Sequence, residues 1–280
     1  MLTTPAHRLR VTLIALLSVS LLLLAVFRFR TTGEHSPAVA KSSTSASRLA
    51  SLPAVILWAW ERPERLDYLD PQKTGVAFLA KTIYLRADEV VSRPRLQPLA
   101  VPPGAAVIAV ARIESAQVRS HGGEPPTLSA RQMEGAAAEI AELGSLPNVV
   151  MVQVDFDATT TERSFYRALL NALRARLPQS TLLSITALAS WCKGDNWLAD
   201  LPIDEAVPML FRMGVERKQF LAQLAAGESF NAKPCQASAG ISTDEPLAQL
   251  PGQQTQRVYV FNPKSWSPEE VKQTLETHQK

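Results

Sequence analysis

Two carboxylates at a spacing of two, Asp155 and Asp157, are the residues of this sequence best placed for acid–base chemistry. They end the apolar run VVMVQVDFDAT. In a β-strand, residues two apart share a face, so both aspartates lie on the face of Gln153, opposite the valines and Phe156. One carboxyl group could donate a proton while the other remains charged, which is the division of work that glycoside cleavage requires.

Further polar and aromatic side chains follow the ends of the other apolar runs. Their types suit a carbohydrate site, with carboxylates for proton transfer, arginines to tune pKa values and tryptophans to stack on sugar rings. The predicted catalytic residues are Asp155, Asp157 and Glu245, and the predicted sugar-binding residues are Trp60, Glu61, Arg112, Glu114, Trp191, Arg212, Asp244 and Asn262. The alternative is structural: such charges also pair with one another, and tryptophans belong to cores.

One pairing within this set can be anticipated. Arg212 stands among large apolar neighbours in VPMLFRMG and needs an acidic partner, for which Asp155 or Asp157 is the natural candidate. We therefore expect both aspartates at the floor of the main pocket, with Arg212 and at least one of Glu114, Asp244 or Glu245 nearby. In such a cluster at least one carboxyl group should have a raised pKa.

The elements that must position these residues are eight short apolar runs, several of them followed by amphipathic segments. This alternation predicts an α/β fold with a (β/α)8-type barrel, whose sites lie at the carboxyl ends of the strands. The expected strands are Val55–Trp60, Val76–Tyr84, Val107–Ile113, Val149–Phe156, Leu182–Ala189, Val207–Met213, Ala239–Thr243 and Val258–Phe261.

The barrel is expected to be irregular or incomplete between its second and third strands. Four prolines there exclude a long crossover helix and favour a hairpin or an irregular excursion: Pro94, Pro98, Pro102 and Pro103. Elsewhere, helix starts are marked by capping boxes, at Ser129 with Gln132, Thr159 with Glu162, and Ser267 with Glu270. Gly144 is expected to end the first of these helices.

The N-terminus carries the apolar segment Val11–Phe27, which has no charge and is flanked by arginines. We expect residues 1–30 to form a membrane anchor, residues 31–51 a disordered Ser-rich tether and residues 52–280 a single barrel-like domain. The arginine distribution predicts a bacterial inner-membrane protein with its body in the periplasm. Cleavage after Ala38-Val39-Ala40, with release into the periplasm, is the alternative.

Charge and cysteine content exclude several classes of site. Residues 1–40 hold four arginines and one glutamate, which together account for the whole net charge of +3, so the body is neutral and has no nucleic-acid footprint. The two cysteines, Cys192 and Cys235, are predicted to form a disulfide that joins two loops at the barrel mouth, with two separate buried thiols as the alternative. The sequence contains no Cys/His cluster, so a structural zinc site is not expected. We assign no metal ligands and expect no cofactor, and whether a metal joins the acidic cluster is left open.

Several segments resemble those of a bacterial family of exported proteins that is itself similar to barrel glycoside hydrolases. The similarity covers most of residues 53–262 and is carried by WAWERPE, VQVDFDA, SITALASWC, EAVPMLFRMG and GISTDEP. The resemblance implies a barrel fold and a glycoside-hydrolase-like site, without fixing an activity.

The strand around Asp155 also resembles the DxxDxDxE strand of chitinase-type enzymes. Asp155 and Asp157 match the second and third acids, whereas Val152 replaces the first and Thr159 stands where the proton-donating glutamate would be. A hydrolase built on this strand must therefore take its acid from another residue. The sequence is compatible with three hypotheses for the function. The protein is a glycoside-hydrolase-like enzyme acting on a polysaccharide or oligosaccharide, a noncatalytic sugar-binding barrel, or a partner-binding protein of the envelope. The glycan, the linkage and the oligomeric state are left open.

Overall fold

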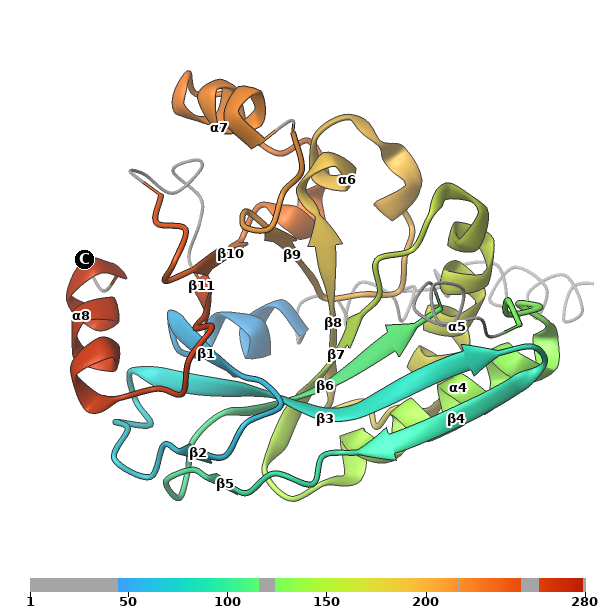
Figure 1. Cartoon of the computed structure of the whole chain (residues 1–280), viewed down its shortest axis with the longest axis horizontal. Helices are drawn as coiled ribbons and strands as arrows, with labels where there is room; N and C mark the ends of the chain where they lie inside the picture. Colours follow the sequence, from blue (N-terminus) through green and yellow to red (C-terminus); the bar gives the residue numbers. More distant parts are fainter. Residues whose placement is uncertain (1–44, 116–123, 216, 248–256, 279–280) are drawn as a thin grey trace, which may run out of the picture. The chain divides into compact units, whose positions relative to one another are not determined.

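The structure is a computed structural model that describes residues 45–115, 124–215, 217–247 and 257–278. Its eight apolar runs form a closed parallel barrel (Figure 1). Its strands are β1 (Val55–Ala59), β3 (Thr74–Arg86), β6 (Val107–Glu114), β7 (Val149–Asp155), β8 (Leu182–Leu188), β9 (Glu205–Met209), β10 (Ser238–Ser242) and β11 (Arg257–Phe261). Strand β1 pairs in parallel with both β11 and β3, which closes the sheet. The predicted (β/α)8-type barrel is confirmed.

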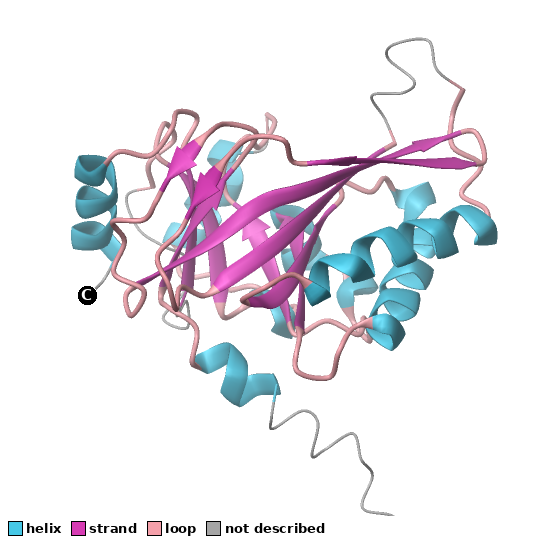
Figure 2. Cartoon of the chain, turned by 90° about the horizontal axis from the view of Figure 1, so that it is seen from below, coloured by secondary structure: helices cyan, strands magenta, loops and turns pink. Residues whose placement is uncertain are grey.

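The first third of the barrel departs from the regular pattern, as the prolines predicted. After β3 the chain turns back into β4 (Glu89–Pro94), which is antiparallel to β3, and the short strands β2 (Glu64–Arg65) and β5 (Leu99–Ala100) pair with each other. No helix occurs within residues 55–115. The β3–β4 hairpin instead reaches past the barrel and runs along a helix of the outer layer (Figure 2).

Helices follow the later strands: α4 (Ala130–Ala141), α5 (Arg163–Arg176), α6 (Ala189–Gly194), α7 (Arg217–Ala225) and α8 (Pro268–His278). Four single turns of 3-10 helix accompany them: η1 (Glu142–Ser145), η2 (Thr160–Glu162), η3 (Asn196–Leu198) and η4 (Lys233–Cys235). The boxes at Thr159 and Ser267 form with both hydrogen bonds. At Ser129 the hydroxyl caps Gln132 N–H, but the Gln132 amide oxygen accepts from Leu128 N–H.

Gly144 does not end a helix in the expected way. Helix α4 ends at Ala141, and the chain continues through η1, which contains Gly144. A Cβ at this position would lie 2.7 Å from the Leu177 side chain. The glycine therefore permits the close approach of η1 to the end of α5.

Strand parity divides the core into an outer and an inner part. Val152 and Val154 of β7 pack outward with Leu169 and Leu173 of α5. Met151 points inward and joins the cluster that fills the barrel, and Gln153, on the same face, accepts from Trp58 Nε1 at 3.0 Å. The predicted assignment of the two faces of β7 is therefore confirmed from Met151 onward, whereas Val150, predicted to face outward, packs against the inner cluster.

The floor of the barrel, where its strands begin, is closed by a buried ion pair and by the residues that precede β1. Arg257 Nη1 lies 2.8 Å from Glu205 Oε1, and both side chains are almost fully buried. The same guanidinium donates to the backbone carbonyls of Leu49 and Pro53. Leu49 belongs to a helix at residues 45–50 and packs against the inner cluster.

This helix corrects the predicted boundary of the tether. Residues 45–50 were expected to be disordered, but Leu49 and the following Leu52 pack against the barrel interior. Residues 45–280 form one compact unit. The expected anchor, Val11–Phe27, and most of the tether lie outside the described residues. Among the residues that are described, no helix has the length and apolarity needed to span a bilayer.

Candidate functional site

A pocket of about 550 Å³ opens at the carboxyl ends of the barrel strands. Its size lies within the range of about 300 to 1,000 Å³ that is typical of small-molecule sites. Residues from six of the eight strands line it: Trp58, Arg112, Asp155, Thr186, Met209 and Phe261. This is the end at which barrel enzymes place their sites, since the loops that follow the strands meet there.

Asp155 is held firmly at one side of this pocket. Only 4% of it is exposed, and its two carboxylate oxygens have different partners. Oδ2 lies 3.0 Å from Arg112 Nη1, and Oδ1 accepts from the Thr186 hydroxyl at 2.6 Å. Register explains the first contact, since Arg112 and Asp155 are directly paired residues of β6 and β7.

Arg112 links this carboxylate to a second one. Its Nε donates to Glu114 Oε1 at 2.5 Å, and its guanidinium lies 5.9 Å from the centroid of the Trp60 ring. Burial by itself would lower the pKa of Arg112, but the charges of Asp155 and Glu114 raise it. The guanidinium therefore remains a permanent positive charge between two acids.

Asp157 differs from Asp155 in having no such partner. Its carboxyl group opens into the pocket, and within the described part of the chain no hydrogen bond or ion pair joins it to another side chain. The surrounding protein nevertheless desolvates it, and the nearby charge of Asp155 adds to this, so that its pKa rises to about 6 in spite of Arg112. Asp157 can therefore carry a proton close to neutral pH.

The opposite side of the pocket is aromatic. Phe211 stacks on Phe261 with ring centroids 5.6 Å apart and an interplanar angle of 5°, and the Trp58 ring lies 6.0 Å from Phe211. Trp60 meets Phe261 edge-on at 6.2 Å. Gly240 makes room for this arrangement, because a Cβ there would lie 2.9 Å from the Trp58 ring. Flat apolar faces of this kind can hold the C–H face of a sugar ring.

The predicted pairing of Arg212 with Asp155 or Asp157 is wrong. Arg212 lines the pocket, but its guanidinium nitrogens lie 2.6 Å from Asp244 and 2.7 Å from Glu245. Strand β9 ends at Met209, and a backbone φ of 53° at Arg212 belongs to the turn that follows. The hydroxyl of Ser242 and the charge of Arg212 lower the pKa of Asp244.

Several other predicted residues do not line this pocket. Glu245 and Asp244 are engaged with Arg212, and Glu61 pairs with Arg93. Asn262 accepts from the Thr243 hydroxyl. Glu114 reaches the site only through Arg112. Of the predicted binding residues, Trp60, Arg112 and Arg212 line it.

Trp191 is also placed differently from the prediction. It is 3% exposed and meets Trp197 edge-on at a centroid distance of 4.8 Å, within the outer core. The ring is therefore a packing residue and is not available as a sugar platform. Its neighbours in α6, Ala189 and Ser190, line the pocket instead.

Four further residues line the pocket that were not predicted from the sequence: Trp58, Thr186, Phe211 and Phe261. A usable signal existed for each of them. Trp58 precedes Trp60 by two positions, and Phe211 and Phe261 lie at or just beyond strand ends. Parity was applied only to β7; applied to every strand, it would have indicated these inward-facing residues.

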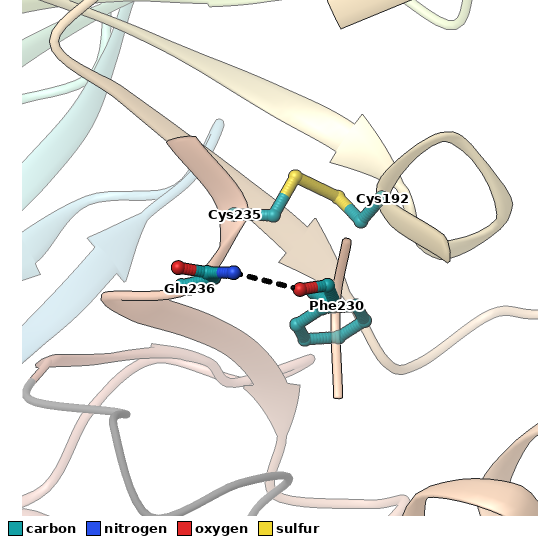
Figure 3. Close-up of a disulfide and its surroundings, with 4 residues drawn as sticks. All are labelled: Cys192, Phe230, Cys235 and Gln236. Atoms are coloured by element: carbon teal, nitrogen blue, oxygen red, sulfur yellow. Dashed lines mark hydrogen bonds between the residues drawn. A yellow bond between two sulfur atoms is a disulfide. The ribbon is translucent and has the colours of Figure 1, made fainter. Parts of the chain in front are cut away.

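The predicted disulfide between Cys192 and Cys235 is present (Figure 3). Its expected place between two mouth loops is wrong, because both cysteines are buried in the outer core, neither lines the pocket, and Cys235 precedes β10. The Cα atoms are 5.8 Å apart, and the bond joins α6 to η4. Beside it, the Gln236 amide donates to the Phe230 carbonyl at 2.9 Å, which fixes the segment before β10. The covalent link therefore ties the helix after β8 to the segment that leads into β10.

Thr159 has a structural task that leaves it no role as an acid. Its hydroxyl donates to Glu162 Oε2 at 2.7 Å, and its backbone N–H donates to the same oxygen at 2.8 Å. The other Glu162 oxygen accepts from Ser115. The position at which chitinase-type enzymes carry their proton donor is thus a helix cap in this chain.

Within the described residues, no group of three or more His, Cys, Asp or Glu side chains is arranged to hold a metal ion. A comparison with protein-family models finds no match to this chain, and a comparison with curated proteins finds no significant similarity. The site must therefore be interpreted from its own geometry.

Proposed function

We propose that this protein is a glycoside-hydrolase-like enzyme that cleaves an oligosaccharide or polysaccharide in the mouth pocket. The observation that carries the proposal is the pair of aspartates. Asp155 is ion-paired with Arg112, whereas Asp157 faces the pocket with a pKa of about 6. Two carboxyl groups whose environments differ in this way provide an acid and a charged partner on the same wall.

In the proposed reaction Asp157 donates its proton to the glycosidic oxygen as the bond to the anomeric carbon breaks. The Asp155 carboxylate, fixed by Arg112 and Thr186, stabilises the positive charge that develops on the sugar. A water molecule then adds to the anomeric carbon and returns a proton to Asp157. The net change is the hydrolysis of one glycosidic bond.

The other groups of the pocket suit the binding of a sugar. Trp60 and Phe261 offer flat faces, and Arg112 can donate to a hydroxyl or a carboxylate of the ligand in addition to its protein partners. No cofactor enters this scheme, because proton transfer and electrostatic stabilisation are sufficient for glycoside hydrolysis.

The test is turnover on a panel of oligosaccharides and chromogenic glycosides, with release of reducing ends as the readout. Asp157→Asn should reduce kcat by about 10²- to 10⁴-fold, the usual contribution of general acid catalysis, while ligand affinity is largely kept. Asp244→Asn is the matched control, since Asp244 lies outside the pocket and pairs with Arg212. Equal loss in both variants, or no turnover by the wild-type protein on any glycan, would contradict the proposal.

The pH profile provides a second test of the same role. If protonated Asp157 is the acid, kcat/KM should fall above about pH 6, as Asp157 loses its proton. A profile that stays flat to pH 8 would exclude it as the donor.

One observation favours the alternative of sugar binding without cleavage. Thr159 occupies the place of the chitinase-type acid and is committed to a helix cap. A binding protein would show a measurable Kd for the same glycans with no reducing-end release, and Asp157→Asn would then alter affinity only.

We also propose that the protein acts in the bacterial envelope, anchored in the inner membrane through Val11–Phe27 or released into the periplasm by cleavage. The disulfide supports this, because such bonds persist in oxidising compartments. Alkaline extraction of membranes is the test. A protein retained in the membrane fraction supports the anchor, and a mature protein beginning at Lys41 in the soluble periplasmic fraction supports cleavage.

A further inference from the structure

The mouth pocket is divided into a polar arc and an apolar arc, and the division follows the strand order. The hydrogen-bonding groups at strands β6 to β8 are Arg112, Asp155, Asp157 and Thr186. From the end of β8 through β9 and β11 to β1, the polar lining side chains are Ser190 and Arg212, and the Arg212 guanidinium is paired with Asp244 and Glu245. The other large side chains of this stretch are apolar. They include Leu188, Met209, Phe211, Met213, Phe261 and Trp58.

Register confirms that the apolar arc is continuous. Leu188 is the residue of β8 directly paired with Met209 of β9, and Met209 is paired in turn with Gly240 of β10. Beyond the end of β9 the turn at residues 211–215 continues this wall, and all five of its residues line the pocket, Phe211 and Met213 among them. The wall is therefore an inward-facing row of a parallel sheet extended by its loop.

Two large apolar side chains prolong this arc onto the rim. Leu188 is 37% exposed and Val215 is fully exposed, although both line the pocket. Exposed apolar side chains that stand singly need no explanation, but two at the rim of an apolar wall extend it outward. An apolar chain leaving the pocket would pass over them.

A bare sugar does not suit the apolar arc. A hydroxyl group facing Met209, Met213 or Phe211 would lose its water and gain no hydrogen bond, which is unfavourable for each group so placed. Aromatic faces accept the C–H side of one ring, but the row of methionine, leucine and valine side chains offers only dispersion contacts. The ligand must therefore present hydroxyl groups to one side and hydrocarbon to the other.

We propose that the ligand is an amphiphilic glycoside: a sugar bound against Asp155, Asp157 and Arg112, carrying an alkyl, acyl or aryl group that lies along the apolar arc and leaves over Leu188 and Val215. This inference rests on the proposed function for the sugar end. It adds the chemical class of the rest of the ligand, which a lipid-linked sugar and an acylated oligosaccharide would share.

The experiment compares pairs of glycosides that differ only in chain length. Methyl and n-octyl glycosides of glucose, galactose, mannose and N-acetylglucosamine are titrated into the full-length protein by calorimetry, below the micelle concentration of each octyl compound. An octyl ether of tetraethylene glycol carries the same chain without a sugar. Burial of a few methylenes should raise affinity for the octyl member of at least one pair by roughly 10- to 100-fold.

Substitutions at the rim then test where the octyl group of the ligand lies. Val215→Ser and the double variant Leu188→Ser/Val215→Ser should reduce the octyl-to-methyl ratio to below about threefold and leave methyl glycoside affinity unchanged. Leu146→Ser is the matched control: Leu146 is 40% exposed but precedes β7, at the other end of the barrel. Because Val215 is fully exposed, Val215→Ser tests the contact without removing core packing.

The outcomes separate the two proposals. Equal affinity for methyl and octyl members overturns the amphiphile inference and leaves the proposed function standing. Octyl glycol ether binding as tightly as the best octyl glycoside overturns sugar recognition, and with it the assignment of a glycoside. A ratio that falls equally in Leu146→Ser also overturns the inference, because the effect would then not belong to the rim. The two possible sources of the ligand are distinguished by measuring reducing-end release from a lipid-linked oligosaccharide and from an O-acylated oligosaccharide.

Discussion

The barrel holds an arginine–carboxylate cluster at each end, and the two clusters differ in how completely they are hydrogen-bonded. At the floor, Glu205 accepts from Arg257, Tyr259, Ser238 and Ser184. At the mouth, Asp155 accepts from Arg112 and Thr186, while Asp157 has a pKa of about 6 and faces the pocket. The same residue types thus build one cluster in which the carboxylate is fully hydrogen-bonded and one that leaves a carboxyl group open to the pocket.

The number of hydrogen-bond donors, more than burial, distinguishes Glu205 from Asp157. Glu205 is 1% exposed, yet four side chains donate to it, and burial together with its charge raises the pKa of Tyr259 so that the phenol remains a donor. Asp157 is more open but is left without such donors among the described residues. A buried charge with full coordination is inert, whereas a partly desolvated carboxyl group without donors can exchange a proton.

The largest expected effect lies at the floor. Glu205→Gln removes the charge opposite Arg257 and should destabilise the fold by about 3 to 5 kcal/mol, because it leaves the guanidinium buried without a counter-charge. Urea unfolding measures the change. Glu134→Gln, which removes an exposed partner of Arg176, is the control and should cost at most about 1 kcal/mol. If the two variants lose similar stability, the floor cluster is not the structural one.

Between these two clusters the outer core is crosslinked by the disulfide, and the second prediction concerns that bond. Cys192→Ser/Cys235→Ser should lower the free energy of unfolding by about 2 to 4 kcal/mol, since the bond constrains the unfolded chain. Reduction of the wild-type protein should reproduce the loss, and the double variant should not respond to reductant. A wild-type unfolding midpoint that does not change with reductant would contradict this.

The third prediction sharpens the difference between the two aspartates. Asp155→Asn weakens a charge-assisted contact with Arg112 and should cost about 1.5 to 3 kcal/mol. It also removes the neighbouring charge that raises the pKa of Asp157, so that pKa should fall and the alkaline limb of any activity profile should move to lower pH. Carboxyl carbon NMR titration reports the pKa directly. An unchanged Asp157 titration would show that the two groups are not coupled.

The smallest change in the free energy of unfolding is expected for Asp157→Asn, and this variant should be stabilised where the others are destabilised. Because the folded-state pKa of Asp157 is raised to about 6, this group favours folding below about pH 4, and that contribution is lost as pH rises through 6. The variant should therefore be more stable than wild type at pH 7, by about 1 kcal/mol after allowance for solvent screening, and equal to it near pH 3. Thermal unfolding across this range is the measurement, and a destabilised variant at pH 7 would assign Asp157 a structural role.

Local patterns in the sequence determined the elements of this protein. Eight apolar runs predicted the eight barrel strands, and prolines predicted that no helix follows β3. Parity placed Asp155 on the inner face of β7 and directed Asp157, two residues beyond, toward the same pocket. These features depend on side-chain periodicity and backbone restrictions within a few residues, which each segment carries by itself.

Tertiary structure alone decided which side chains meet. Arg112 and not Arg212 contacts Asp155, because the register between β6 and β7 makes Arg112 and Asp155 direct neighbours and the turn after β9 takes Arg212 to Asp244 and Glu245. Barrel closure likewise brings Trp58 and Phe261 into the pocket and leaves Trp191 in the outer core. Register and closure are set by the packing of the whole sheet, so no single segment of the sequence contains them.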